Sequence, residues 1–232
     1  MLDELKERTL EANLRIVREG LLVGTFGNVS AIDRATRLVI IKASGVPYVE
    51  MKVEHMVVVS LETGEALDSP WRPSSDTPTH LELYRTFPGV GGIVHTHSPH
   101  ATAWAQARRP IPVLGTTHAD YFNGPVPCTR SMRPDEIETD YEANTGKVIA
   151  ERFADLSPAE FPGVLVASHG PVTWGQSVEH AVDHAVVIEY IARMASDTLR
   201  LDPDAPPVTD ALLRKHFQRK HGTSAYYGQR RG

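Results

Sequence analysis

The chain carries at residues 91–97 the stretch Gly91-Gly92-Ile93-Val94-His95-Thr96-His97, a short apolar run that ends in two histidines. Short apolar runs bounded by glycine are typical of buried strands, which predicts a β-strand over 93–97. Side chains two residues apart on a strand point to the same face. We therefore expect His95 and His97 to lie side by side, as a pair of ligands for zinc or a related divalent metal.

Two further candidate ligands follow from similar patterns. The apolar run at 163–168 leads into His169 and Gly170, so a second predicted strand ends in a histidine. Asp76 lies in the loop Ser74-Ser75-Asp76-Thr77-Pro78, directly ahead of an apolar-periodic segment. Three imidazoles and one carboxylate form a donor set typical of zinc or manganese. The position of Asp76 leaves a second interpretation open, in which its side chain only caps the following helix.

Length and composition predict one large globular domain. The chain has 232 residues, of which 41% are hydrophobic and 23% charged. The net charge of −5 argues against a nucleic-acid partner, and the one short basic stretch lies at 214–221. No apolar run approaches the roughly 18 residues of a membrane span, so no membrane partner is expected. The single cysteine, Cys128, excludes an intrachain disulfide and is expected of a cytoplasmic protein.

Hydrophobic periodicity predicts mixed helices and strands, and therefore a single α/β layered domain over 1–232. The predicted helices cover 2–21, 77–87, 100–107, 133–154 with a break, 178–201 and 211–220. The predicted strands cover 29–32, 38–41, 56–61, 93–97, 111–114, 163–168 and 171–174.

Three loops have the residues that bind an anion. They cover 24–28, 42–45 and 74–75 and combine glycine with hydroxyl, amide or ammonium groups. Because Ser74 and Ser75 directly precede Asp76, we expect the phosphate of a substrate to lie close to the metal. Neither a P-loop nor a dinucleotide fingerprint is present, so neither ATP nor a dinucleotide is expected.

These stretches together resemble the class II aldolase and epimerase superfamily, which includes the adducin head domain. The matching segments are 27–30, 42–46, 73–80, 92–97, 115–122, 168–171 and 215–229. The chain is similar to the phosphopentose epimerases of this superfamily, because similar aldolases carry glutamate where this chain has Asp76. The resemblance implies a three-layer α/β/α sandwich around a mainly antiparallel sheet. It also implies a homotetramer with active sites at the subunit interfaces.

The resemblance assigns roles to individual residues. It implies a divalent metal, Zn²⁺ with Mn²⁺ or Co²⁺ as alternatives, held by Asp76, His95, His97 and His169. It places a phosphorylated ketopentose on Gly27, Asn28, Lys42, Ser44, Gly45, Ser74, Ser75, His216 and Arg219. Asp120 and Tyr227 would transfer protons. The C-terminal helix and tail over 209–232 would complete the active site of a neighbouring subunit.

The implied activity is epimerisation of L-ribulose 5-phosphate at carbon 4 to D-xylulose 5-phosphate, in pentose catabolism of the L-arabinose type. Carbon 4 is not adjacent to the ketone at carbon 2, so its proton is not acidic. Retro-aldol cleavage and re-addition to the opposite face needs an electron sink, which a metal supplies, and two acid/base groups. A class II aldolase and a non-catalytic scaffold are the competing interpretations. The retained candidate ligands argue against the scaffold, and Asp76 argues against the aldolase.

Two questions stay open at this point. Catalytic zinc usually keeps three protein ligands and one open position, whereas four candidate ligands are present. Either Asp76 binds weakly or leaves when substrate binds, or the metal expands its coordination. His80 lies one turn after Asp76 and is expected to support the ligands from behind, while the remaining histidines are expected in packing or surface positions.

Overall fold

The computed structural model describes residues 2–67, 69–223 and 225–226. The helices are α1 (Leu2–Arg18), α2 (Thr77–Thr86), α3 (Pro99–Gln106), α4 (Thr116–Ala119), α5 (Pro134–Glu138), α6 (Tyr141–Arg152), α7 (Val178–Leu201) and α8 (Asp210–His221), with 3₁₀ turns η1 (Tyr48–Glu50) and η2 (Val53–His55). The strands are β1 (Asn28–Asp33), β2 (Leu38–Lys42), β3 (Met56–Ser60), β4 (Ala66–Leu67), β5 (Gly92–His95), β6 (Gly163–Leu165) and β7 (Pro171–Gly175).

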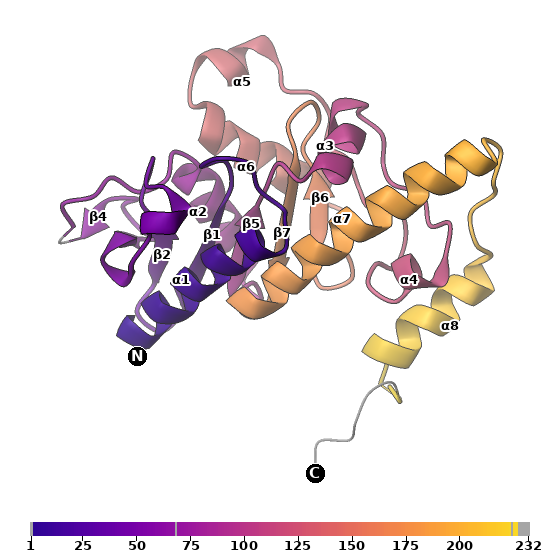
Figure 1. The fold of residues 1–232 in the computed structure, drawn as a ribbon, viewed down its shortest axis with the longest axis horizontal. Helices are drawn as coiled ribbons and strands as arrows, with labels where there is room; N and C mark the ends of the chain where they lie inside the picture. The colour runs from indigo at the N-terminus through magenta and orange to yellow at the C-terminus, as the bar shows by residue number, and fades with distance from the viewer. Residues whose placement is uncertain (1, 68, 224, 227–232) are drawn as a thin grey trace.

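The strands form one seven-stranded sheet in the order β4-β3-β2-β1-β5-β7-β6. Every neighbouring pair in it is antiparallel. Helices α1 and α7 cover one face of the sheet, and α2 packs with α6 on the other side (Figure 1). The predicted α/β/α sandwich with a mainly antiparallel sheet is therefore confirmed.

The central strands are apolar on both faces because each face is covered by helices. In β1, Val29 and Ala31 pack with residues of α1 and α7, while Ile32 belongs to the core on the α2 side. In β5, Val94 faces α1 and α7, and Ile93 faces the α2 side. This alternation decides which side each polar residue of β1 and β5 faces, because side chains two apart share a face.

Three predicted strands differ from the structure. Strand β6 ends at Leu165 rather than at 168, because the turn to β7 begins there, with the Val166 N–H donating to the Gly170 carbonyl oxygen at 2.9 Å. Strand β5 ends at His95 rather than at 97, because Pro99 already begins α3 and the chain leaves the sheet. The predicted strand at 111–114 does not join the sheet, and its described strand pairing is one isolated bridge, Ile111 with Val126. Proline at 110 and 112 removes the N–H groups that a sheet ladder would need there.

The predicted helices agree closely with the structure. The break expected within 133–154 lies between α5 and α6, and α7 covers the predicted range 178–201. Helix α1 ends at Arg18, three residues before the predicted end at 21. Among the helices of the described ranges, none is both long and apolar enough to cross a membrane.

Candidate active site

His95 is positioned by strand β5. Ile93 packs on the α2 side, so His95, two residues later, faces the same side. Its Nδ1–H donates to the carbonyl oxygen of Pro171 at 3.0 Å. The Nε2 atom of His95 is therefore free to face the second histidine, and it lies 3.1 Å from Nε2 of His97.

His97 and His169 lie in two loops. His97 follows the end of β5, and its ring stacks on Phe26 at a centroid distance of 5.8 Å. His169 lies in the tight turn between β6 and β7, directly after Ser168 with a φ of 62°. A Cβ atom at Gly170 would lie 2.7 Å from the Thr96 carbonyl oxygen, so only glycine lets this turn approach β5 so closely.

The three histidines form the histidine centre, which we define as His95, His97 and His169. Their ring centroids are 5.0, 4.8 and 5.0 Å apart, and one ring nitrogen of each lies within 4.8 Å of the others. Burial, followed by the neighbouring His95, lowers the pKa of His97. Burial, with His95 and His97, lowers the pKa of His169 to about 4. These two rings are neutral at neutral pH, so the donor set suits a divalent metal.

Asp76 lies at the N-cap position of α2, but its side chain accepts no hydrogen bond from that helix. Its Oδ2 atom instead accepts a hydrogen bond from Asn28 Nδ2 at 2.6 Å. Burial would raise the pKa of Asp76, but the charges of His95 and His80 and the Asn28 bond outweigh it and lower the pKa. The carboxylate lines the same cavity as His95 and His169 but is outside the tight three-histidine group. A capping role therefore does not account for Asp76, and ligation stays a prediction.

The three predicted anion-binding loops lie next to one another. The backbone N–H of Ser74 donates to the Lys42 carbonyl oxygen at 2.9 Å, and that of Ser44 donates to the Arg72 carbonyl oxygen at 2.9 Å. Asn28 Nδ2 also donates to Ser74 Oγ at 3.2 Å, which attaches the first loop. Burial lowers the pKa of Lys42, opposed by the charge of Asp76.

Gly27, Gly45 and Ser75 are the other predicted substrate contacts within these loops, whereas the predicted contacts His216 and Arg219 lie on α8. Gly27 has a φ of 84°, and a Cβ atom there would lie 2.8 Å from the His95 carbonyl oxygen. Gly45 and Ser75 are exposed, next to the buried Lys42 and Ser74. The structure thus brings seven predicted residues around Asp76, and their contact with substrate stays a prediction.

Asp120 lies at the end of α4 and is bound to α8. Arg219 Nε and Nη2 donate to its two carboxylate oxygens at 3.0 and 2.6 Å, and His216 Nδ1 lies 3.0 Å from Oδ1. His221 Nε2 donates to its backbone oxygen at 2.8 Å. Burial raises the pKa of Asp120, but the Arg219 and His216 bonds outweigh it and lower the pKa. We call these residues, Asp120, His216, Arg219 and His221, the Asp120 cluster.

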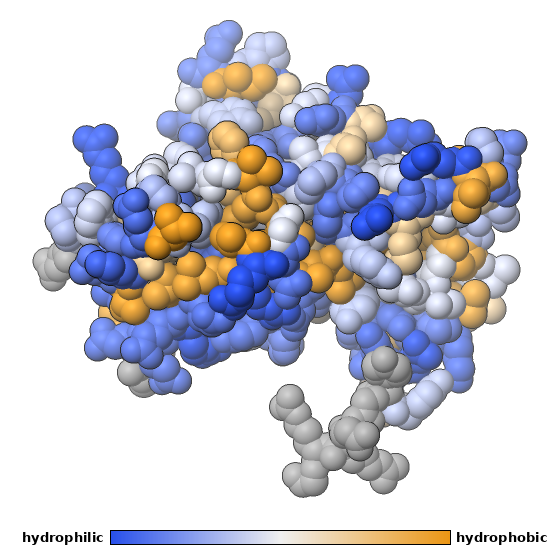
Figure 2. Space-filling view, viewed as in Figure 1, coloured by the Kyte–Doolittle hydropathy of each residue, from blue (hydrophilic) through white to orange (hydrophobic). Residues whose placement is uncertain are grey.

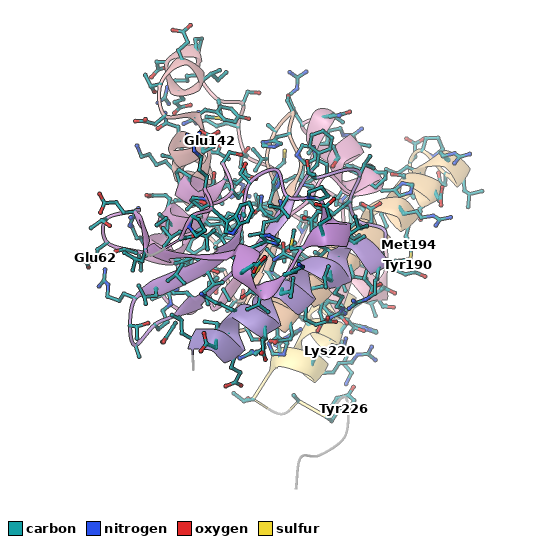
Figure 3. The ribbon with its side chains drawn as sticks, turned by 60° about the vertical axis from the view of Figure 1, so that its left-hand side comes forward. Glu62, Glu142, Tyr190, Met194, Lys220 and Tyr226 are labelled. Carbon is teal, nitrogen blue, oxygen red and sulfur yellow. The ribbon has the colours of Figure 1, made fainter. Side chains whose placement is uncertain are left out.

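The Asp120 cluster is separate from the histidine centre of its own chain. Across the described residues, no hydrogen bond, ion pair or ring contact connects the two groups. Figure 3 shows Lys220 on α8 and Tyr226 just beyond it, near the end of the described chain. The Tyr226 N–H donates to the Arg219 carbonyl oxygen at 3.0 Å. The predicted catalytic Tyr227 lies outside the described residues.

Tyr141 is a contact of the histidine centre that the sequence did not predict. Its hydroxyl oxygen lies 3.3 Å from His169 Nδ1, and its ring stacks on His169 with an interplanar angle of 28°. The contact fixes the His169 ring from the side of α6. No motif surrounds Tyr141, and its position depends on the packing of α6 against α2, which sequence spacing does not reveal.

Known proteins resemble this chain over nearly its whole length. Residues 7–196 match the family described as class II aldolase and adducin N-terminal domain. Proteins named L-ribulose-5-phosphate 4-epimerase UlaF, from Salmonella paratyphi A and Salmonella typhi, are 52% identical over 99% of this chain and 100% of their own length. The solved structure of an L-fuculose 1-phosphate aldolase superposes with a TM-score of 0.79 at 24% identity, over 93% of this chain and 95% of that one. The chain therefore belongs to the class II aldolase and adducin N-terminal domain family.

Proposed function

We propose that this protein is a metal-dependent L-ribulose-5-phosphate 4-epimerase that forms D-xylulose 5-phosphate in cytoplasmic pentose catabolism. The observation that carries the proposal is the histidine centre, with the carboxylate of Asp76 in the same cavity. The full-length identity of 52% to proteins named for this reaction supports the substrate. The single cysteine is in keeping with a reducing compartment.

His95, His97, His169 and Asp76 would hold the metal. Three neutral imidazoles and a carboxylate suit Zn²⁺, with Mn²⁺ or Co²⁺ as alternatives. When bound, the metal would act as a Lewis acid that stabilises the negative charge left on the ketose fragment after the bond between carbons 3 and 4 breaks.

The three anion-binding loops would hold the substrate phosphate. Lys42 supplies a positive charge, Ser44, Ser74 and Ser75 supply hydroxyl groups, and Gly27, Asn28 and Gly45 line the approach. Anchoring the phosphate keeps the aldehyde fragment in the site while its carbonyl group rotates to present the opposite face. Asn28 connects these loops to Asp76, which couples phosphate binding to the metal ligands.

Asp120 and Tyr227 would move the proton of the carbon 4 hydroxyl on opposite faces of the aldehyde. Arg219 and His216 keep Asp120 ionised, so it is the group that accepts this proton. Since Asp120 is bound to α8, it acts together with the segment 209–232. We place this unit at the histidine centre of a neighbouring subunit, because within the described residues Asp120 contacts His216, Arg219 and His221 but not the histidine centre.

This arrangement requires an oligomer, for which we propose a homotetramer. Figure 2 shows hydrophobic residues gathered over the face that carries α1. Val17, Val23 and Phe26, from the end of α1 and the following loop, are 40%, 68% and 60% exposed. Neighbouring copies of the chain would bury an apolar surface of this kind.

The decisive experiment follows both products of one reaction. The metal-loaded protein is incubated with L-ribulose 5-phosphate, and D-xylulose 5-phosphate and free glycolaldehyde phosphate are assayed in parallel. The proposal predicts xylulose phosphate without free aldehyde, and loss of this activity on chelation. Accumulation of free aldehyde would instead identify a class II aldolase.

A further inference from the structure

His80 is a buried histidine to which the proposed chemistry gives no role. It lies one turn after Asp76 on α2 and is 0% exposed. Its Nδ1 atom lies 2.7 Å from Ser30 Oγ, whereas its Nε2 atom has no hydrogen-bond partner in the described part of the chain. An unpaired polar atom at such depth is costly, so the position of Nε2 requires an explanation.

A chain of hydroxyl groups lies behind the His80 ring. The fully buried Tyr84 hydroxyl oxygen lies 2.8 Å from Ser30 Oγ, and Ser30 Oγ lies 2.7 Å from His80 Nδ1. A neutral ring that accepts from Ser30 at Nδ1 carries its proton on Nε2.

The His80 ring lines a small cavity that also borders the histidine centre. The cavity has room for roughly one water molecule. Its wall includes His80, Asp76, His95 and His169. With Nδ1 turned to Ser30, Nε2 is the nitrogen of His80 that is available to a partner in this cavity. Asp76 lies one turn before His80 at the start of α2, and it lines the same cavity, where its carboxylate offers an acceptor.

We propose that His80 is a positioning residue for Asp76, whose carboxylate receives a hydrogen bond from His80 Nε2–H through one water in this cavity. Asn28 binds Oδ2 of Asp76 from one side. The second contact, from His80, would fix the carboxylate in the orientation that the metal needs. The chain Tyr84–Ser30–His80 then serves to keep the proton on Nε2. This inference rests on the proposed metal site and adds a residue that touches neither metal nor substrate.

Two substitutions at His80 separate the role of Nε2 from packing. The amide nitrogen of glutamine reaches about as far as Nε2, so His80→Gln keeps a donor toward Asp76 and loses the Ser30 contact. The shorter His80→Asn keeps the Ser30 contact and loses the donor. The readouts are the dissociation constant for Zn²⁺, measured by chelator competition, the absorption spectrum of the Co²⁺ form, and the melting temperature.

The proposal predicts that His80→Asn weakens Zn²⁺ binding by about 10- to 100-fold and changes the Co²⁺ spectrum, while His80→Gln stays close to wild type in both. In an Asp76→Asn background, His80→Asn has no further effect on affinity. His184→Asn is the control, because this half-buried histidine binds the Trp174 carbonyl oxygen far along the chain from Asp76. It lowers the melting temperature and leaves Zn²⁺ affinity unchanged.

Each contrary result has a separate meaning. Unchanged Zn²⁺ affinity in His80→Asn, or additive losses in the double variant, overturns the role of His80 and leaves the metal site intact. A wild-type protein without Zn²⁺ affinity overturns the proposed function and this inference with it. Ring ¹⁵N–¹H spectra of the wild-type protein test the tautomer without any substitution. They should show the His80 proton on Nε2, and a proton on Nδ1 contradicts the proposal.

Discussion

The histidine centre is assembled at the edge of the central sheet, from the end of β5, the loop after it and the turn between β6 and β7, whereas the Asp120 cluster joins one short helix to α8 away from the sheet (Figure 1). Backbone geometry positions the histidines: a strand end, a tight turn and a glycine that permits close approach. Side-chain ion pairs position Asp120, and Phe217 is the one buried residue of the described helix α8.

This difference suggests that the two regions have separate roles, one in metal binding and one in proton transfer. A metal site needs ligands held to within fractions of an ångström, which a sheet with helices on both faces provides. A group that meets the site of another subunit must lie at the periphery, where few contacts within its own chain hold it. The comparison therefore predicts that substitutions in the two regions have different consequences for metal binding, stability and turnover.

The largest effect is expected from His97→Asn. The variant should lose metal binding, and turnover should fall by at least about 10³-fold, because metal stabilisation contributes several kcal/mol to the transition state. Metal content and epimerase rate are the measurements. His100→Asn is the matched control, because the structure ties this neighbouring histidine to Glu189 through its backbone N–H. Full activity in His97→Asn would show that the histidine centre is not needed for the reaction.

Asp120→Asn should separate turnover from metal binding. Loss of a general base lowers kcat by about 10²-fold or more, while metal content stays at the wild-type level. Loss of the charged hydrogen bonds to Arg219 and His216 should also lower the free energy of unfolding by about 2 kcal/mol. Metal analysis, kinetics and urea unfolding measure the three effects. A loss of metal in this variant would show that the Asp120 cluster, like the histidine centre, is needed for metal binding.

The stability that Asp120 provides should depend on pH in a defined direction. Its folded-state pKa is lowered, so the contribution is complete above the unfolded-state pKa of about 3.9 and is lost as pH falls through the lower folded value. Urea unfolding of wild type and Asp120→Asn, compared at several pH values, measures it. The difference in free energy of unfolding between the two proteins should become smaller as the pH falls below about 4. A difference that grows on acidification would contradict a stabilising role for the ionised Asp120.

The smallest effect is expected from Phe26→Ala. Phe26 is 60% exposed and stacks on His97, so its loss removes an aromatic contact but no ligand. A contact of this kind contributes about 1 kcal/mol, which predicts a weakening of metal affinity of less than about tenfold. Chelator competition measures this effect. A loss as large as that of His97→Asn would mean that the loop, and not the sheet, positions the centre.

The sequence predicted the parts of the molecule that local patterns determine. The strand before His95, the turn at His169 and helix α7 follow from apolar runs, glycine and helical periodicity. The end of β5 was placed too late, because the helix start at Pro99 competes with the strand for His97. The segment at 111–114 is apolar, but Pro112 within it and Pro110 before it lack N–H groups, so hydrophobicity alone gave a wrong prediction there.

Contacts that depend on tertiary packing could not be read from spacing. Tyr141 reaches His169 only because α6 packs against α2. Asp120 and Arg219 are 99 residues apart, and no pattern of period two or 3.6 connects them. The resemblance to the family named both residues without indicating that they bind each other.

In the proposed enzyme, the histidine centre of one subunit works with the Asp120 cluster of its neighbour. Co-expression of His97→Asn and Asp120→Asn chains in equal amounts tests it most directly, since each variant alone should be inactive. With random assembly, about a quarter of the sites would combine an intact histidine centre with an intact Asp120, and activity should return to about that fraction of wild type. If mixed assemblies form and remain inactive, the two regions act within one chain and the claim is wrong.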